Sequence, residues 1–266
     1  MLKSGNNISI FYILLVFAGG FALMFIIAPL LNLFLQSTSS SLFETLSDKE
    51  VQNSIGLTIG ISFAGTLFFA ILAIPLALLL ARKDFFGKKL ITALIDLPIV
   101  IPHSAAGIAL LGFISRDSLL GKTAGFFGFD LIGHPVGIAL AMAFVSVPFL
   151  INAARDGFLS VPKRYEFAAQ NLGASPGRVF LSISLPLAWR HIVSGLVMMF
   201  GRGMSEFGAV IIIAYHPMIT PVLIYERFTQ FGLKYAQPVS VIFIAICLLF
   251  FVLFRMLTLK PFKSND

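Results

Sequence analysis

Six stretches of this chain run for more than 20 residues with at most two charged side chains each, and this feature restricts the folds open to it. About 20 mostly apolar residues wound as an α-helix can cross the hydrocarbon core of a bilayer. Charged residues make up only 12% of the chain, whereas a soluble domain carries about 25%. Too few polar side chains remain to cover a water-facing surface, so the composition excludes an ordinary soluble domain and predicts a membrane protein.

The chain is predicted to be an all-α polytopic membrane protein, with residues 1–266 forming one transmembrane domain. The first apolar run resembles a secretory signal at its start, but a signal has an apolar core of only about 7–15 residues and then a small-residue cleavage site. This run is far longer and lacks such a site, which predicts a retained span. The predicted spans are 10–35, 51–81, 90–115, 133–154, 191–214 and 235–256.

The distribution of Lys and Arg predicts the orientation, because cytoplasmic loops of membrane proteins are enriched in these residues. With six spans both termini lie on one side, and that side holds 13 Lys and Arg residues against 5 in the opposite loops. We therefore expect a multi-pass protein of the cell membrane with both termini in the cytoplasm. The net charge of +7 then reflects topology and contact with membrane lipid, and no nucleic-acid partner is predicted.

The long cytoplasmic loop at 155–190 is predicted to contain two short helices. Ser160 and Ser175 each come shortly before a proline, a pattern typical of helix starts, and Gly173 suits the left-handed residue that ends a helix. The first helix has an apolar, small-residue face, which either packs on the spans of the chain or docks a cytoplasmic partner. That face consists of Tyr165, Ala168, Ala169 and Leu172.

The spacing in this loop resembles a known motif. Ala168-Ala169, three residues, Gly173, nine residues and then Ile183-x-Leu185-Pro186 is similar to the EAA loop in the membrane subunits of ATP-binding cassette importers. One position departs from that motif, because its Glu is replaced here by Phe167. Glu166 lies one residue earlier, about 100° around the helix.

Three further segments, 97–102, 146–148 and 201–209, look like the molybdate/tungstate branch of these permeases, to which sulfate permeases are close relatives. The resemblance implies a non-catalytic subunit that holds no cofactor and forms an oxyanion pathway with a second copy of itself. It implies two cytoplasmic ATPases that use ATP–Mg and an extracytoplasmic oxyanion-binding protein as further partners. The residues that it assigns to ATPase coupling are Glu166, Phe167, Ala168, Ala169, Gly173, Ile183, Leu185 and Pro186.

Ionisable residues inside a predicted span are costly and face the bundle interior or a water-filled cavity. Arg202 and Glu206 lie four residues apart on one helix face, with Ser205 between them and Ser104 in the third predicted span. One interpretation is a pathway whose positive group and hydroxyls attract an oxyanion. The other is an ion pair, between Arg202 and Glu206 or with Asp96, that fixes helix packing.

Two further patterns concern assembly. Small residues recur every fourth position at Gly56, Gly60 and Ala64, and again at Gly201, Ser205 and Ala209, which favours close helix packing. The run 220–231 is predicted to be a short helix on the outer side. Together with loops 42–50 and 116–130 it either receives the binding protein or seals the outer mouth.

Other function classes stay open at this point. The chain could be a permease for sulfate, thiosulfate or another anion, a secondary transporter that works alone, or an integral-membrane enzyme. The four histidines lack metal-ligand spacing, and Leu120–Thr123 lacks the first glycine of a phosphate-binding loop, where Arg116 stands. The polar cluster of the enzyme alternative would be Asp96, His103, Arg202 and Glu206.

Overall fold

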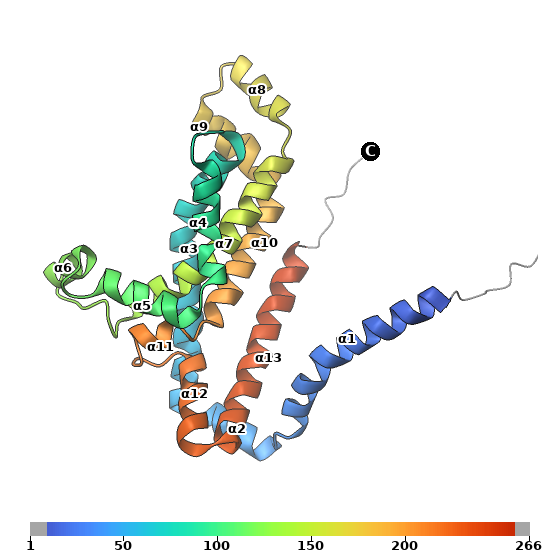
Figure 1. Ribbon diagram of the computed structural model, residues 1–266, viewed down its shortest axis with the longest axis vertical. Coiled ribbons are helices and arrows are strands. Elements are labelled where there is room, and N and C mark those ends of the chain that lie inside the picture. Colours follow the sequence, from blue (N-terminus) through green and yellow to red (C-terminus); the bar gives the residue numbers. More distant parts are fainter. Residues whose placement is uncertain (1–9, 259–266) are drawn as a thin grey trace, which may run out of the picture.

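The structure is a computed structural model that describes residues 10–258, and every regular element in that range is a helix (Figure 1). The predicted cytoplasmic chain ends, at 1–9 and 259–266, lie outside the described residues. The helices are α1 Ile10–Leu35, α2 Ser39–Ser47, α3 Lys49–Arg82, α4 Lys88–Val100, α5 His103–Ile114, α6 Leu119–Phe126, α7 Pro135–Ser160, α8 Lys163–Asn171, α9 Pro176–Val179, η1 Phe180–Ser184, α10 Leu185–Met204, α11 Val210–Ile213, α12 Thr220–Phe231 and α13 Leu233–Thr258.

The core is built where α7 packs between α3 and α10 (Figure 1). Glycines permit this close approach, because an added Cβ would overlap a neighbouring helix. At Gly157 that Cβ would lie 2.6 Å from the Cβ of His191, and at Gly195 it would lie 2.9 Å from the Cβ of Ala153. Without a hydrophobic effect between helices in lipid, such tight contacts supply much of the association energy.

Substituting Gly157 by Ala is expected to destabilise the bundle by about 1–3 kcal/mol, because overpacking forces helices apart. Gly112→Ala provides a matched control, since Gly112 is also helical and a Cβ there meets no atom of the described chain within 4 Å. Thermal unfolding of both variants in detergent measures the difference. Equal melting temperatures for the two variants would contradict the packing argument.

The glycines of the small-residue stripes predicted from sequence do not pack against other helices of this chain, whereas Ala209 of the second stripe is buried against Gly107. A Cβ added at Gly56, Gly60 or Gly201 would meet nothing within 4 Å in the described residues. Helix α1 is likewise exposed along its whole length and projects away from the bundle (Figure 1). These apolar faces are therefore available to lipid or to another protein.

The predicted span at 90–115 consists of two helices with a sharp bend between them. Helices α4 and α5 meet at a bend of 114°, with Ile101 and Pro102 in extended conformation between them. Pro102 has no N–H to continue the ladder, and the residue before a proline is disfavoured in helical conformation. Five helices are long and apolar enough to cross a membrane, and the bent pair makes up to six.

The boundaries of the predicted loop 155–190 and of the predicted span 191–214 are also wrong. Helix α7 continues to Ser160, whose hydroxyl donates to the carbonyl of Gly157 instead of capping a new helix. After α8, the next candidate span starts at Pro176 and continues through α9, η1 and α10 to Met204. The loop is therefore 161–175, and the segment 205–209 is not helical.

A π-helical turn lets this last helix continue past Pro186. The N–H of Leu185 donates to the carbonyl of Phe180, five residues back. Pro186 has no N–H and would clash with a carbonyl in a regular α-helix, so a widened turn accommodates it. The sequence motif at Ile183-x-Leu185-Pro186 thus lies within the stem of a span and does not end a loop helix.

Candidate functional site

Helix α8 forms one end of the molecule, beyond the ends of the bundle helices (Figure 1). It has no buried residue, and Tyr165 and Leu172 of the predicted apolar face are 45% and 89% exposed, while the neighbouring Phe167 is 58% exposed. The apolar face therefore does not pack on the chain's own spans, which was one of the two predicted interpretations. Exposed apolar side chains on a short helix are suited to docking a partner.

The end of the loop that leads into α9 has the local structure that the sequence predicts. Gly173 has φ +88°, in the left-handed region that only glycine adopts easily. The hydroxyl of Ser175 accepts the N–H of Arg178 and so caps the next helix. Helix α8 is consequently held at a fixed angle between two helix ends.

Glu166 faces inward, in contrast to the exposed residues around it. The guanidinium of Arg82 binds both carboxylate oxygens, with a shortest N–O distance of 2.8 Å, and the Ser184 hydroxyl donates to Oε1 at 2.7 Å. Burial raises the pKa of Glu166, but the hydrogen bonds from Arg82 and Ser184 outweigh it and leave the pKa below its usual value. The carboxylate is thus ionised and bound within the chain.

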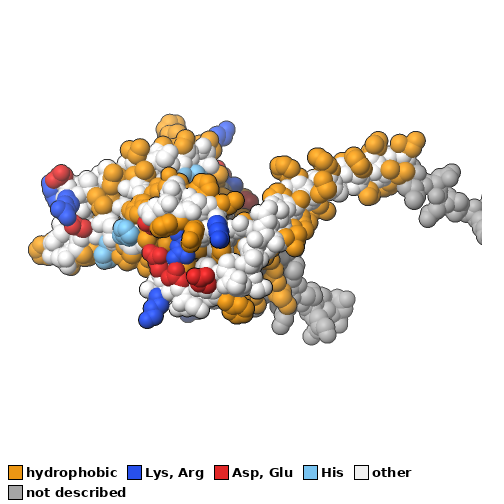
Figure 2. Space-filling model, turned by 90° about the horizontal axis from the view of Figure 1, so that it is seen from below, with side chains coloured by type: hydrophobic (Ala, Val, Ile, Leu, Met, Phe, Trp, Pro, Cys, Tyr) orange, Lys and Arg blue, Asp and Glu red, His pale blue; other side chains and the backbone are white. Residues whose placement is uncertain are grey.

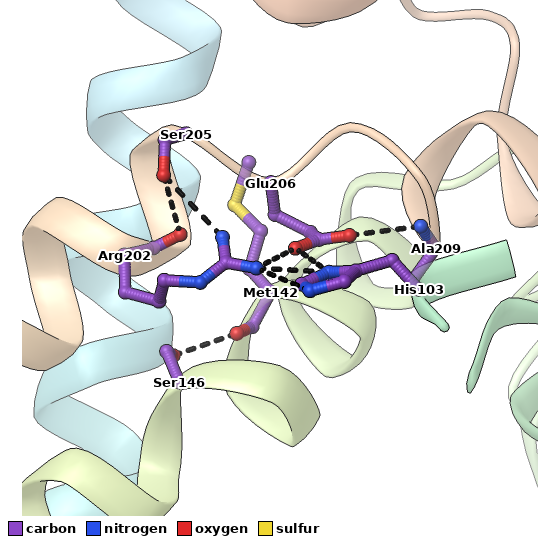
Figure 3. A network of polar contacts seen from close by, with 7 residues as sticks. All are labelled: His103, Met142, Ser146, Arg202, Ser205, Glu206 and Ala209. Carbon is purple, nitrogen blue, oxygen red and sulfur yellow. Dashed lines mark hydrogen bonds and ion pairs between the residues drawn. The ribbon is translucent and has the colours of Figure 1, made fainter. Parts of the chain in front are cut away.

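A polar network joins the start of α5, next to its break from α4, to the non-helical segment 205–209 that follows α10 (Figure 3). The Arg202 guanidinium lies 2.9 Å from Glu206 Oε2 and 2.8 Å from His103 Nδ1, and that nitrogen lies 2.7 Å from the same carboxylate oxygen. The other carboxylate oxygen accepts the N–H of Ala209. Glu206 is only 1% exposed, so its charge is compensated entirely by these neighbours.

The network confirms the predicted ion pair between Arg202 and Glu206, although Glu206 lies beyond the end of α10. Ser205 is exposed and accepts a hydrogen bond from Arg202 at 3.3 Å. Ser104 is exposed beside His103. Of the predicted pathway residues, Arg202, Ser205 and Glu206 are therefore in direct contact.

The predicted pairing of Asp96 with Arg202 is wrong. Asp96 accepts a hydrogen bond of 2.6 Å from Asn152, which ties α4 to α7. No contact joins Asp96 to the network in the part of the chain that the structure describes. His103, which the enzyme alternative groups with Arg202 and Glu206, does contact both of them, so that predicted cluster forms without Asp96.

Arg202 and Ser205 also border a groove of about 470 Å³ between α10 and α13. The other walls are apolar and include Phe200, Phe250 and Phe254. Irregular backbone at membrane depth is tolerated where it is buried in protein or lines a cavity, which fits the unwound segment 205–209 beside this groove. Arg202 is the charged residue in the lining of this groove.

A second hollow, of about 1050 Å³, lies at the other end of the bundle between α2, α12 and the start of α13. Arg227 on α12 pairs with Asp48 and Glu50 at the start of α3, and its hydrogen bond lowers the pKa of Asp48. Acidic side chains gather on this end of the molecule (Figure 2), among them Glu44 and Glu226 of the hollow. Helix α12 has the bounds predicted for the outer-side helix.

The arrangement gives no sign of metal chemistry. Within residues 10–258 no group of three or more His, Cys, Asp and Glu side chains is placed to hold a metal ion. Arg202, His103 and Glu206 instead satisfy one another.

Comparison with protein families gives one match. The model of the family described as "Binding-protein-dependent transport system inner membrane component" matches residues 73–260, which include α8, the polar network and both broken helices.

Individual relatives cover nearly the whole chain. The molybdate/tungstate transport system permease protein WtpB of Thermococcus kodakarensis is 42% identical over 250 residues, or 92% of this chain and 96% of the relative. The sulfate transport system permease protein CysT of Escherichia coli is 30% identical over 247 residues, or 90% of this chain and 88% of the relative. A solved bacterial alginate ABC transporter, in complex with an alginate pentasaccharide-bound periplasmic protein, superposes with a TM-score of 0.75 over 97% of this chain and 96% of its own, at 16% identity.

Proposed function

This chain belongs to the family of binding-protein-dependent transport system inner membrane components and is a permease subunit of an ATP-binding cassette importer, and we propose that its cargo is molybdate or tungstate. The observation that carries the proposal is the 42% identity to a molybdate/tungstate permease over almost the whole length of both chains. Sulfate is the alternative cargo. Identity to the sulfate permease is only 30%, and this difference favours molybdate or tungstate as the cargo.

The protein is a multi-pass membrane protein, and we place it with six spans and both termini in the cytoplasm. Counting the bent pair α4 and α5 as one crossing gives the sixth span. The excess of Lys and Arg on one side supports the orientation. Helix α8 then lies on the cytoplasmic side, and the hollow between α2 and α12 lies outside.

We propose that two copies of the chain line the pathway. The exposed helix α1 and the open glycine faces at Gly56, Gly60 and Gly201 support a second copy, because close helix contacts in membranes use such small residues. Gly201 and Arg202 both line the apolar groove between α10 and α13, so in this arrangement the edge of the groove at Arg202 lies near the second copy.

We further propose that two separate ATPases bind ATP–Mg and dock on α8, and that the chain itself catalyses no reaction. The exposed apolar residues Phe167 and Leu172 support docking, with Ala168 and Ala169 leaving room for close approach. The integral-membrane enzyme is disfavoured, because Asp96 is bound to Asn152 and not to the proposed catalytic cluster.

Closure of the ATPase pair would displace α8 and, with it, the helices on either side of the loop. The stem formed by Ile183, Leu185 and Pro186 belongs to the same continuous helix as Arg202. Tilting that helix moves the polar network at the broken helices and changes which side the pathway opens to. On the outer side we expect the binding protein to dock around α12, where Arg227 pairs with Asp48 and Glu50.

Substituting Gly173 by Ala is expected to reduce import per ATP hydrolysed, because a side chain at φ +88° costs about 1–2 kcal/mol and changes the angle of α8. Gly177→Ala is the matched control, since both positions have open space around an added Cβ and Gly177 is helical. Import and ATP hydrolysis are measured together in proteoliposomes. An equal ratio in both variants would argue against a fixed coupling angle.

The cargo is tested by import of labelled molybdate into proteoliposomes that contain this chain, its ATPase and its binding protein. We expect import that depends on ATP and is competed by tungstate and not by sulfate. Competition by sulfate at equal concentration would move the assignment to the sulfate branch. Import without the ATPase would overturn the importer mechanism and favour a secondary transporter.

A further inference from the structure

We propose that Arg82 is a positioning residue that ties the coupling helix α8 to the ends of two spans, so that a displacement of α8 moves both together. The inference rests on the proposed coupling role of α8. Arg82 is the last residue of α3. Arg82 lies outside the coupling motif, whose residues are all between 166 and 186.

The first part of the tie joins α8 to α3. Arg82 Nε donates to Glu166 Oε1 and Oε2 at 3.0 and 2.9 Å, and Nη2 donates to Oε1 at 2.8 Å. The Nη2 group also donates to the carbonyl of Val161, at 3.1 Å, in the turn just before α8. The planar guanidinium thus fixes both the carboxylate and the backbone that leads into the helix, which a lysine ammonium could not do in the same geometry.

The second part joins α8 to the stem of α10. The Ser184 hydroxyl donates to Glu166 Oε1 at 2.7 Å, and Ser184 is only 2% exposed. Ser184 is the last residue of the π-helical turn that accommodates Pro186. Such turns are frequent at functional sites because they redirect side chains out of the regular helical register.

Burial of apolar side chains does not provide this connection. Helix α8 has no buried residue, so polar contacts must determine where it lies. The side chains of Arg82 and Glu166 are each 12% exposed, which shields the pair from water and salt. A pair of this kind resists displacement more strongly than an exposed surface ion pair.

The tie also explains why the acidic residue is displaced by one position from the family motif. Glu166 points to α3 and α10, and Phe167, about 100° further around the helix, points outward. In this chain the contact of α8 with α3 is ionic, through Glu166, and the side chain that α8 presents outward at the next position, Phe167, is apolar. The acid therefore fixes the helix within the permease and leaves docking to its neighbours.

The decisive variant is Arg82→Ala, compared with Lys83→Ala. Lys83 is the adjacent cation, and its side chain makes no ion pair in the described residues. Both are assembled with ATPase and binding protein in proteoliposomes, and molybdate import, ATP hydrolysis and co-purification of the ATPase are measured. We expect Arg82→Ala to retain the ATPase but import about tenfold less molybdate per ATP, with Arg82→Lys intermediate because it cannot bridge both oxygens. Lys83→Ala should match the wild type.

Two results would overturn the proposal. One is a wild-type ratio of import to hydrolysis in Arg82→Ala. The other is a loss of ATPase co-purification that parallels the loss of import, since Arg82 would then act on docking of the ATPase and not on the transmission of its movement. Glu166→Gln supplies a second variant in case Arg82→Ala does not fold, because it keeps the side-chain shape and removes the charge.

A spin label at Gln170, an exposed residue of α8, tests the tie without any cargo. In a Cys247→Ser background the label on the full-length permease should become more mobile with Arg82→Ala and not with Lys83→Ala. Unchanged mobility would overturn the proposal. If the wild-type complex imports neither molybdate nor tungstate, the cargo assignment fails, and this measurement still decides the role of Arg82.

Discussion

Substituting Phe167 by Asp is expected to abolish stable binding of the ATPase. Phe167 is 58% exposed on a helix that buries none of its own residues, and the acid that the family motif has at this position is absent. Aromatic residues at the centre of an interface carry much of its binding energy, and truncating one costs about 2 kcal/mol or more, a factor of about 30 in affinity.

Co-purification of the ATPase with the tagged permease measures this effect. Phe231→Asp is the matched control, because Phe231 is 60% exposed on α12 at the opposite end of the bundle. We expect the control to retain the ATPase and Phe167→Leu to lose only part of it. If Phe167→Asp still binds the ATPase as the wild type does, the docking face lies elsewhere.

The sequence predicts the membrane helices best where a single physical requirement decides. Helix α1 has the predicted bounds 10–35, because only an uncharged run of this length satisfies the bilayer. Helix α12 has the predicted bounds 220–231. Gly173 is left-handed as predicted, because no other residue type ends a helix there as easily.

The sequence alone does not predict which proline breaks its helix, because the effect of a proline depends on the helices around it. Pro75 and Pro148 lie inside the continuous helices α3 and α7, whereas Pro102 separates α4 from α5. Neighbouring helices decide whether the carbonyl freed by a proline finds another donor. The sequence around each proline does not contain that information.

Tertiary contacts account for what the sequence missed in the site. The tie from Glu166 to Arg82 spans 84 residues, and the contact from Arg202 to His103 spans 99. Spacing along one helix predicts the pair of Arg202 and Glu206, but it cannot bring in a residue from another helix. The sequence thus located the coupling loop and the polar pair and left their partners undetermined.

Substituting Arg202 by Ala is expected to destabilise the bundle by about 3 kcal/mol, because it leaves the charge of Glu206 buried with less compensation. Glu206 is 1% exposed, and the remaining contacts would be His103 and the N–H of Ala209. The double variant Arg202→Ala, Glu206→Gln removes both charges and should recover much of the lost stability. Thermal unfolding of the wild type, both single variants and the double variant in detergent gives the coupling energy between the two sites.

The same variants decide between the two interpretations of Arg202. If its charge mainly holds the broken helices together, the double variant regains stability and imports molybdate with little change in KM. If its charge attracts the oxyanion, Arg202→Ala raises KM with little effect on melting temperature, and removing the acid as well does not restore import. Because Glu206 and His103 both lie within hydrogen-bonding distance of the guanidinium, we expect the first outcome. A rise in KM at unchanged stability would contradict it and would place the guanidinium on the path of the anion.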